Sequence, residues 1–142
     1  MKIKESRVVK VCDLMTRKPH LIDGAVSVFD AAIKMQCFGC GFLPVGNYRN
    51  IIGVITDRDI VTRVVAEDKD PEKICVKEVM SFDPFFCFEE DPLKKVVVDM
   101  YQYNIRRILV LDKNRILIGV LSIGDIIRRL KDKTLLISEG TL

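Results

Sequence analysis

The sequence has no long hydrophobic run and no excess of charge of one sign. The stretch from Met1 to Arg7 has no apolar core of signal-peptide length, and no later run approaches a membrane span. These absences predict a cytoplasmic protein with no membrane partner. The 23 basic and 20 acidic residues leave a net charge of +3, so the overall balance does not call for nucleic acid or an acidic membrane.

A regular framework of cysteines is also absent. The five cysteines are an odd number and lie among apolar residues, which is typical of reduced thiols. No nucleophile, base and orienting group converge in the sequence, so it predicts a protein that is not an enzyme. The 49% of hydrophobic and 30% of charged residues predict a folded, soluble chain.

One turn occurs twice, as GVITDRDI from Gly53 to Ile60 and as GVLSIGDI from Gly119 to Ile126. In each copy a β-rich apolar run breaks at a Thr or Ser, and an Asp follows three residues later. An amphipathic helical pattern then begins. Taken alone, this spacing favours a capping box, in which both side chains satisfy helix-end amides. Its duplication favours a site that holds a ligand at the Ser122–Asp125 turn.

The duplication covers most of the chain. The matched positions are Met15 with Met80, Pro19 with Pro84 and Met35 with Met100, each 65 apart, and Gly53 with Gly119, which are 66 apart. The extra residue predicts an insertion near one of the two hairpin turns, at 47–50 or 112–115, where insertions are tolerated best.

Each copy predicts an extended segment, a helix, an antiparallel hairpin and a second helix. The hairpins place Phe42 near Thr56 and Arg107 near Ser122. The first helix of each copy is expected to end at a residue that tolerates the left-handed conformation, Gly39 or Asn104. Their N-caps are expected at Ser27 and at Asp91, which precedes Pro92.

A β-α-β-β-α unit of this size cannot bury both faces of its sheet. The sequence therefore predicts an α+β fold in which two repeats pack sheet to sheet with pseudo-twofold symmetry. The expected boundaries are 8–66 for the first repeat, 67–75 for a charged linker, 76–131 for the second repeat and 132–142 for a C-terminal tail. Half of the phenylalanines Phe82, Phe85, Phe86 and Phe88 are expected in the core, because alternate extended positions face opposite ways.

These features together resemble a tandem pair of CBS domains, named for cystathionine β-synthase. The resemblance rests on two copies of Met-Thr/Ser-x-x-Pro, a helix, an apolar strand, and Gly-Val-x-Thr/Ser-x-x-Asp, and it covers residues 8 to 131. It implies a stand-alone Bateman-type module that binds AMP, ADP, ATP or S-adenosylmethionine in clefts between the repeats. It also implies a homodimer and a regulated partner protein, with no cofactor beyond the regulatory ligand.

The resemblance implies two unequal ligand sites. In both, the Asp would accept from ribose hydroxyls and the helix N-terminus would face phosphate. The more complete site would consist of Ser122, Asp125, Arg106, Arg107, His20, Leu21 and Ile22. The weaker site, which has Gly41 and Phe42 where the other has two arginines, would consist of Thr56, Asp59, Arg58, Gly41, Phe42, Phe85, Phe86 and Cys87.

Two other functions remain open at this level. The arginine clusters, at Arg106 with Arg107 and at Arg128 with Arg129, would suit a nucleic-acid or protein-interaction module. Cys37 and Cys40 have the spacing of a metal or redox pair, although no second pair completes four ligands. His20, the one histidine, suits either stacking on a ligand or an ordinary loop position.

Overall fold

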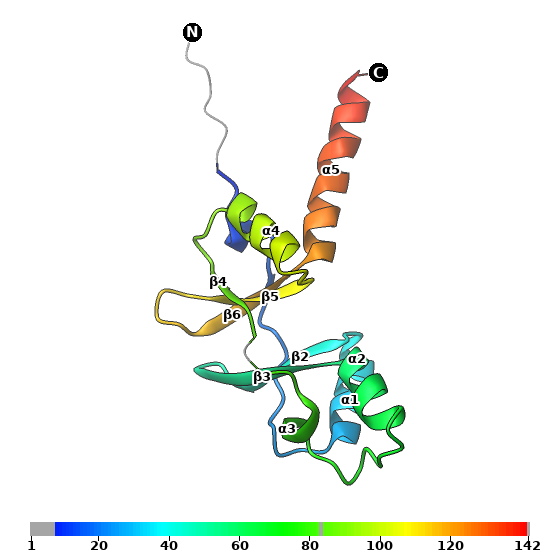
Figure 1. The fold of residues 1–142 in the computed structure, drawn as a ribbon. Helices are drawn as coiled ribbons and strands as arrows, with labels where there is room; N and C mark the ends of the chain where they lie inside the picture. The colour runs from blue at the N-terminus through cyan, green and yellow to red at the C-terminus, as the bar shows by residue number, and fades with distance from the viewer. Residues whose placement is uncertain (1–7, 83, 142) are drawn as a thin grey trace. The chain divides into compact units, whose positions relative to one another are not determined.

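The computed structural model describes residues 8–82 and 84–141, with side chains described as far as residue 132 (Figure 1). Met1 to Arg7, Asp83 and Leu142, the last residue of the predicted tail, lie outside the described residues. The chain divides into two compact units. The first-repeat unit is Lys18–Phe85. The second-repeat unit consists of the described residues up to Arg17 together with those from Phe86 onward. Both units mix helix and sheet, which confirms the α+β class.

The first-repeat unit is built on one antiparallel hairpin, β2 (Phe42–Asn47) with β3 (Asn50–Thr56). An isolated parallel bridge joins Ile22 to Val45, and an antiparallel one joins Val54 to Ser81. The helices are α1 (Val28–Phe38), α2 (Asp57–Ile60) with the π-helical turn η2 (Val61–Val65), and α3 (Val76–Val79).

The second-repeat unit repeats this plan with two further strands beside its hairpin. Its four-stranded sheet has the order β1-β6-β5-β4, in which only the pairing of β4 with β5 is parallel. Its strands are β1 (Thr16–Arg17), β4 (Phe86–Phe88), β5 (Arg107–Leu111) and β6 (Leu117–Ser122). Its helices are the short 3-10 turn η1 (Val11–Asp13), α4 (Leu93–Gln102) and α5 (Ile123–Thr141).

The predicted hairpin registers are confirmed. Phe42 pairs with Thr56, and Arg107 pairs with Ser122. Both hairpins have a bulge at their closed end, where Gly46 pairs with Ile51 in one and Leu111 pairs with Leu117 in the other. The second turn spans one more residue than the first, so the insertion lies in this turn, as predicted.

The two sequence repeats exchange short segments. Strand β1, which belongs to the first repeat in sequence, pairs with β6 of the second. Ser81, which belongs to the second repeat in sequence, pairs with Val54 of the first. Each hairpin is therefore completed by the Met-Thr or Met-Ser segment that leads into the other repeat.

This exchange explains the glycine of the duplicated turn. A Cβ at Gly119 would lie 2.7 Å from the Met15 sulfur and 2.9 Å from the Thr16 carbonyl oxygen. A Cβ at Gly53 would likewise lie 2.8 Å from the Met80 sulfur. The strand therefore needs glycine where the exchanged methionine crosses it.

Most of the predicted helix ends are confirmed. Gly39 and Asn104 have φ of 61° and 52°, and the Ser27 side chain accepts from the Asp30 amide at 3.0 Å. The predicted cap at Asp91 is wrong, because Pro92 is the N-cap of α4. The Asp91 carboxylate instead accepts from the Phe88 amide at 2.9 Å, closing the loop before the helix.

Each unit has its own apolar core. In the first-repeat unit α1 and the hairpin enclose Val28, Leu43, Val45, Ile55 and Val64, all fully buried. In the second-repeat unit the core includes Val11, Met15, Cys87, Val96, Val110 and Leu121. Burying one such side chain stabilises a fold by about 1.5–3 kcal/mol.

The prediction for the four phenylalanines is wrong. Phe82, Phe85, Phe86 and Phe88 are 66%, 45%, 40% and 38% exposed. In β4 the alternation holds, but it turns Phe86 and Phe88 outward together and leaves Cys87 as the buried residue.

The last helix is longer than the repeat predicts. Helix α5 continues past Lys131 to Thr141, so helical backbone replaces most of the predicted tail (Figure 1). None of the described helices is long and apolar enough to cross a membrane.

Candidate functional site

The second copy of the turn forms a capping box at the start of α5. The Ser122 amide donates to Oδ2 of Asp125 at 2.9 Å, and the Asp125 amide donates to Oγ of Ser122 at 3.1 Å. Asp125 is only 7% exposed. The sequence places these two residues together because β6 ends at Ser122 and the helix starts at the next position.

The other carboxylate oxygen of Asp125 has two further partners. The Thr16 hydroxyl on β1 lies 3.4 Å from Oδ1, and a guanidinium nitrogen of Arg128 forms an ion pair with the same atom. Arg128 is one turn along α5, and its side chain is 70% exposed. Asp125 thus connects the exchanged strand β1, the end of β6 and the first turns of α5.

The predicted arginine pair lies beside this turn. Arg107 pairs with Ser122 across the hairpin, and the Ile123 amide donates to the Arg106 carbonyl at 2.9 Å. Both arginine side chains are exposed. The backbone therefore places two arginines next to a helix N-terminus, an arrangement that favours an anion.

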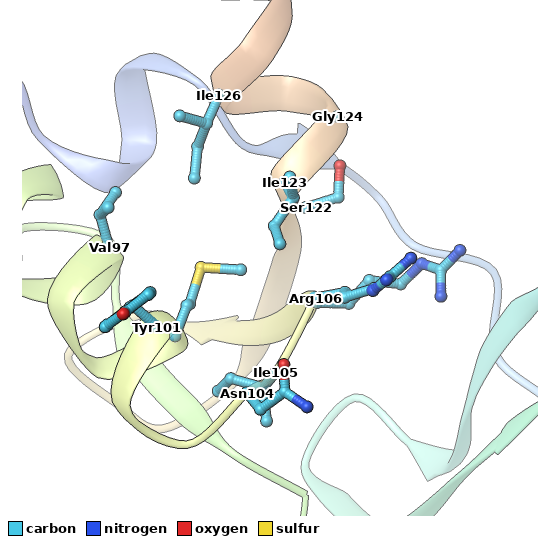
Figure 2. A pocket seen from close by; sticks show the side chains of 11 residues that line it. Val97, Tyr101, Asn104, Ile105, Arg106, Ser122, Ile123, Gly124 and Ile126 are labelled. Carbon is cyan, nitrogen blue, oxygen red and sulfur yellow. The ribbon is translucent and has the colours of Figure 1, made fainter.

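A cavity of about 780 Å³ opens at the same place (Figure 2). Most of its wall is apolar and comes mainly from α4 and α5. Asn104 and the arginine pair, at the start of β5, supply its polar part. In Figure 2 the Arg106 side chain extends away from the apolar residues. Ser122 belongs to the lining, and the apolar residues are Val97, Met100, Tyr101, Ile105, Ile123 and Ile126.

The first copy of the turn has the same cap. The Thr56 amide donates to Oδ2 of Asp59 at 3.0 Å, and the Asp59 amide donates to the Thr56 hydroxyl at 3.1 Å. Ser81 donates to Oδ1 of Asp59 at 3.3 Å, in the role that Thr16 has for Asp125. A nitrogen of Arg63 lies 3.8 Å from the same oxygen.

The arginine partners of the two aspartates differ. Arg63, on the π-helical turn η2, donates to the carbonyl oxygens of Val79 and Met80 at 2.8 and 3.1 Å. Its guanidinium group is therefore anchored to the end of α3. The corresponding contact in the second copy comes from Arg128, whose ion pair with Asp125 is made by a largely exposed side chain.

The strand beside the first turn carries a different charge. The Asp57 amide donates to the Gly41 carbonyl at 2.9 Å, which matches the bond between Ile123 and Arg106. A Cβ at Gly41 would collide with the Asp57 carboxylate. An acid thus stands where the second copy has an arginine pair, while Phe42 is half-buried and Arg58 is exposed. This local charge disfavours an anionic ligand.

The residues predicted to flank an adenine lie in the first-repeat unit. The His20 ring stacks on Phe38, with centroids 3.6 Å apart and planes 14° from parallel. Ile22 is buried and paired with Val45. The carbonyl of Leu21 accepts from Lys34, and a cavity of about 290 Å³ is lined by Leu21 and Ile22.

Cys87 has a packing role in its own unit. Its side chain is 4% exposed in the core of the second-repeat unit. Burial, with the nearby carboxylates of Asp91 and Asp99, raises the pKa of this thiol from 9.0 to about 12. Phe86, on the same strand, is exposed, as is Phe85 in the first-repeat unit.

Each predicted ligand site draws on both units. Ser122, Asp125, Arg106 and Arg107 share the second-repeat unit, whereas His20, Leu21 and Ile22 belong to the other. Thr56, Asp59, Arg58, Gly41, Phe42 and Phe85 share the first-repeat unit, whereas Phe86 and Cys87 do not. Each complete site therefore stays a prediction. The structure describes only the part of each site that lies within one unit.

The predicted thiol pair is not joined by a disulfide. Cys37, at the end of α1, is exposed, and Cys40 is half-buried. Within the part of the chain that the structure describes, no three His, Cys, Asp or Glu side chains gather in a way that could hold a metal ion.

Sequence reasoning missed two partners of Asp125. Arg128 lies three positions along the helix, a spacing at which ion pairs are common, so it could have been found. Thr16 was visible only as the residue after a matched methionine, and Ser81 occupies the same place in the second copy. The repetition of a hydroxyl residue after each methionine was the signal.

The fold and the two capped turns define a duplicated α+β repeat protein. The family model described as CBS domain matches residues 11–66 and 76–132. The chain therefore belongs to the CBS domain family and carries two copies of the domain.

Similar proteins come from archaea and bacteria. The chain is 34% identical over 118 residues to the uncharacterized protein MK0525 of Methanopyrus kandleri, covering 82% of this chain and 57% of that protein. It is 31% identical over 121 residues to the uncharacterized protein YlbB of Bacillus subtilis, covering 84% and 80%. The chain thus spans little more than half the length of the first relative.

A solved structure with the same fold contains ligands. The chain matches the CBS domain pair of protein MJ0100, in complex with 5′-methylthioadenosine and S-adenosyl-L-methionine, with a TM-score of 0.76 and 26% identity. The match covers 89% of this chain and 99% of that one.

Proposed function

We propose that this CBS pair is a non-enzymatic sensor, which binds an adenosine-containing ligand and passes a conformational signal to a partner protein. The observation that carries the proposal is the Ser122–Asp125 turn with Arg106 and Arg107 on the adjoining strand. This arrangement supplies an acceptor for ribose hydroxyls, the positive end of the α5 dipole and two cations for phosphate. The ligand complex of the similar MJ0100 pair supports the same ligand class.

The proposed ligand is AMP, ADP, ATP or S-adenosylmethionine. The arginine pair favours a ligand with negative charge at the Asp125 turn. His20, Leu21 and Ile22 are proposed to flank the adenine, and the Asp59 turn is proposed as a second, weaker site because Asp57 lies beside Gly41.

Calorimetric titration of the whole chain with each of the four ligands tests the function. We expect at least one to bind with a dissociation constant below 1 mM, a range in which a binding free energy exceeds about 4 kcal/mol. We expect Asp125→Asn to weaken that binding at least tenfold and Asp59→Asn to change it less. Failure of all four ligands to bind would refute the sensor function. An affinity that is unchanged by Asp125→Asn would refute the proposed site.

We also propose a cytoplasmic homodimer. Helices α4 and α5 expose apolar side chains of the kind that subunit interfaces cover. Val97, Val98, Tyr101, Ile127 and Leu130 are 36%, 56%, 89%, 56% and 58% exposed.

A further inference from the structure

The carboxylate of Asp125 is already engaged. A carboxylate offers about four acceptor positions. The Ser122 amide takes one on Oδ2, and the Thr16 hydroxyl and Arg128 both approach Oδ1. A ligand that presents two neighbouring hydroxyl groups to Asp125 therefore meets competition at Oδ1. This step rests on the proposed function, since it takes Asp125 as the acceptor for the ligand.

Thr16 lies where the chain leaves the second-repeat unit. Strand β1 is held to β6 by only two residue pairs, Thr16 with Val120 and Arg17 with Gly119. The next residue, Lys18, begins the first-repeat unit and has φ of 54°. A lysine in this left-handed region is unfavourable and persists only where neighbouring contacts hold it. The contact of Thr16 with Asp125 thus helps to hold β1 two residues before this junction.

The two copies differ in how firmly this contact is supported. Asp59 also accepts from a hydroxyl, that of Ser81, but Ser81 lies four residues before the end of its unit at Phe85. The arginine beside Asp59 is anchored on two carbonyl oxygens at the end of α3. The Arg128 side chain is 70% exposed, so it loses few packing contacts when it moves away from Asp125. Asp125 is therefore the aspartate whose protein partners a ligand can more easily replace.

We propose that Thr16 and Arg128 are positioning residues that occupy Asp125 in the ligand-free chain. The ligand hydroxyls replace them, and loss of the Thr16 contact loosens β1 at the junction of Arg17 with Lys18. Binding at one turn is thereby converted into a change in one of the two segments that connect the units. In the first copy, the contact between Asp59 and Ser81 is expected to stay in place.

Hydrogen exchange on the full chain tests the ligand-free half of this mechanism. Thr16→Val keeps the shape of the side chain and removes its hydroxyl group. We expect it to raise exchange of the β1 amide that faces β6 at least fivefold, while the amides of β5 change less than twofold. Equal exchange of β1 in the variant and the parent protein overturns the proposal, whatever the ligand.

Binding of adenosine tests the competition. Adenosine has the ribose hydroxyls without a phosphate, so a change in charge near the site affects it little. We expect Arg128→Gln to bind adenosine at least threefold more tightly than the parent protein, and Arg129→Gln, its neighbour on α5 with the same change in charge, to bind as the parent does. Equal affinities of the two variants overturn the competition.

The two proposals fail in distinguishable ways. If adenosine and all four proposed ligands bind neither the parent protein nor any variant, the proposed function and the displacement step both fall. If AMP binds and Asp125→Asn abolishes binding, but AMP leaves β1 exchange in the parent protein unchanged, the function stands and the coupling to the junction is refuted. Faster exchange of β1 on adding AMP supports both.

Discussion

The sulfur atom of Met15 lies against Gly119, so that a Cβ at this glycine would be 2.7 Å from it. The two residues come from segments far apart in sequence, and their contact seats β1 on β6. The same relationship recurs between Met80 and Gly53.

Gly119→Ala is therefore expected to destabilise the chain by about 1–3 kcal/mol, the usual cost of overpacking a filled site. Urea unfolding measures the change. Gly124→Ala is the matched control, because a Cβ there would meet no atom closer than 3.5 Å, and alanine favours helix. An alanine at position 119 that leaves stability unchanged would contradict the packing of Met15 on this strand.

The buried thiol of Cys87 predicts a loss of stability at high pH. Its pKa is about 12 in the folded chain, against 9.0 for an ordinary thiol. Above pH 9 the unfolded chain releases this proton while the folded chain keeps it, so stability falls as the pH rises from 9 towards 12. Below pH 9 the group contributes nothing to the pH dependence.

The unfolding free energy in urea, measured between pH 8 and 10.5, checks this effect. We expect Cys87→Ala to reduce the downward slope above pH 9 by no more than about 1.4 kcal/mol per pH unit, the limit for one proton. Cys37→Ala, at an exposed thiol, should keep the parental slope. Parallel curves for the Cys87 variant and the parent would show that this thiol titrates normally.

The arginine pair predicts a difference between AMP and adenosine. Replacing Arg106 and Arg107 by glutamine should weaken AMP binding about tenfold or more and adenosine binding less than twofold, because only AMP carries phosphate. Calorimetry at two salt concentrations should also show a smaller salt dependence for the variant.

Lys94→Gln with Lys95→Gln provides the control for that experiment. Both lysines are exposed on α4, and the pair removes the same charge. If the lysine variant loses as much AMP affinity as the arginine variant, general charge and not the strand position accounts for binding. Binding of duplex DNA or RNA that is lost with the arginines would favour the interaction-module alternative.

The exposed apolar residues of α4 and α5 predict self-association. Ile127→Asp places a charge in the middle of this surface, so it should convert a dimer to a monomer in sedimentation experiments at micromolar concentration. Thr62→Asp, an exposed position on η2 of the other unit, is a control for added charge. A parent protein that sediments as a monomer would refute the homodimer.

Local rules made much of the fold predictable. The hairpin register followed from two β-branched runs with a short polar turn, and it placed Arg107 beside Ser122. Gly39 and Asn104 have the predicted left-handed conformation because helix ends favour residues that tolerate it. The capping boxes depend on a spacing of three residues, which the sequence shows directly.

The features that escaped prediction depend on distant contacts. Thr16 and Asp125 are 109 positions apart, and a two-residue strand carries no periodicity that would reveal its pairing. Asp91 was predicted to be a helix cap because it precedes Pro92, but its carboxylate accepts a hydrogen bond from the Phe88 amide instead. In β4 only the middle residue, Cys87, is buried. Hydrophobicity alone predicts that the larger phenylalanines on either side fill the core, and it does not show which way the strand faces.

The exchange of segments has a consequence for the separate halves of the chain. One repeat together with its own leading Met-Thr or Met-Ser segment lacks the segment that completes its hairpin, which the other repeat supplies. A single repeat expressed alone is therefore expected to pair with a second copy that supplies this segment. In the tandem chain the exchange is internal, so the two capped turns need not be identical.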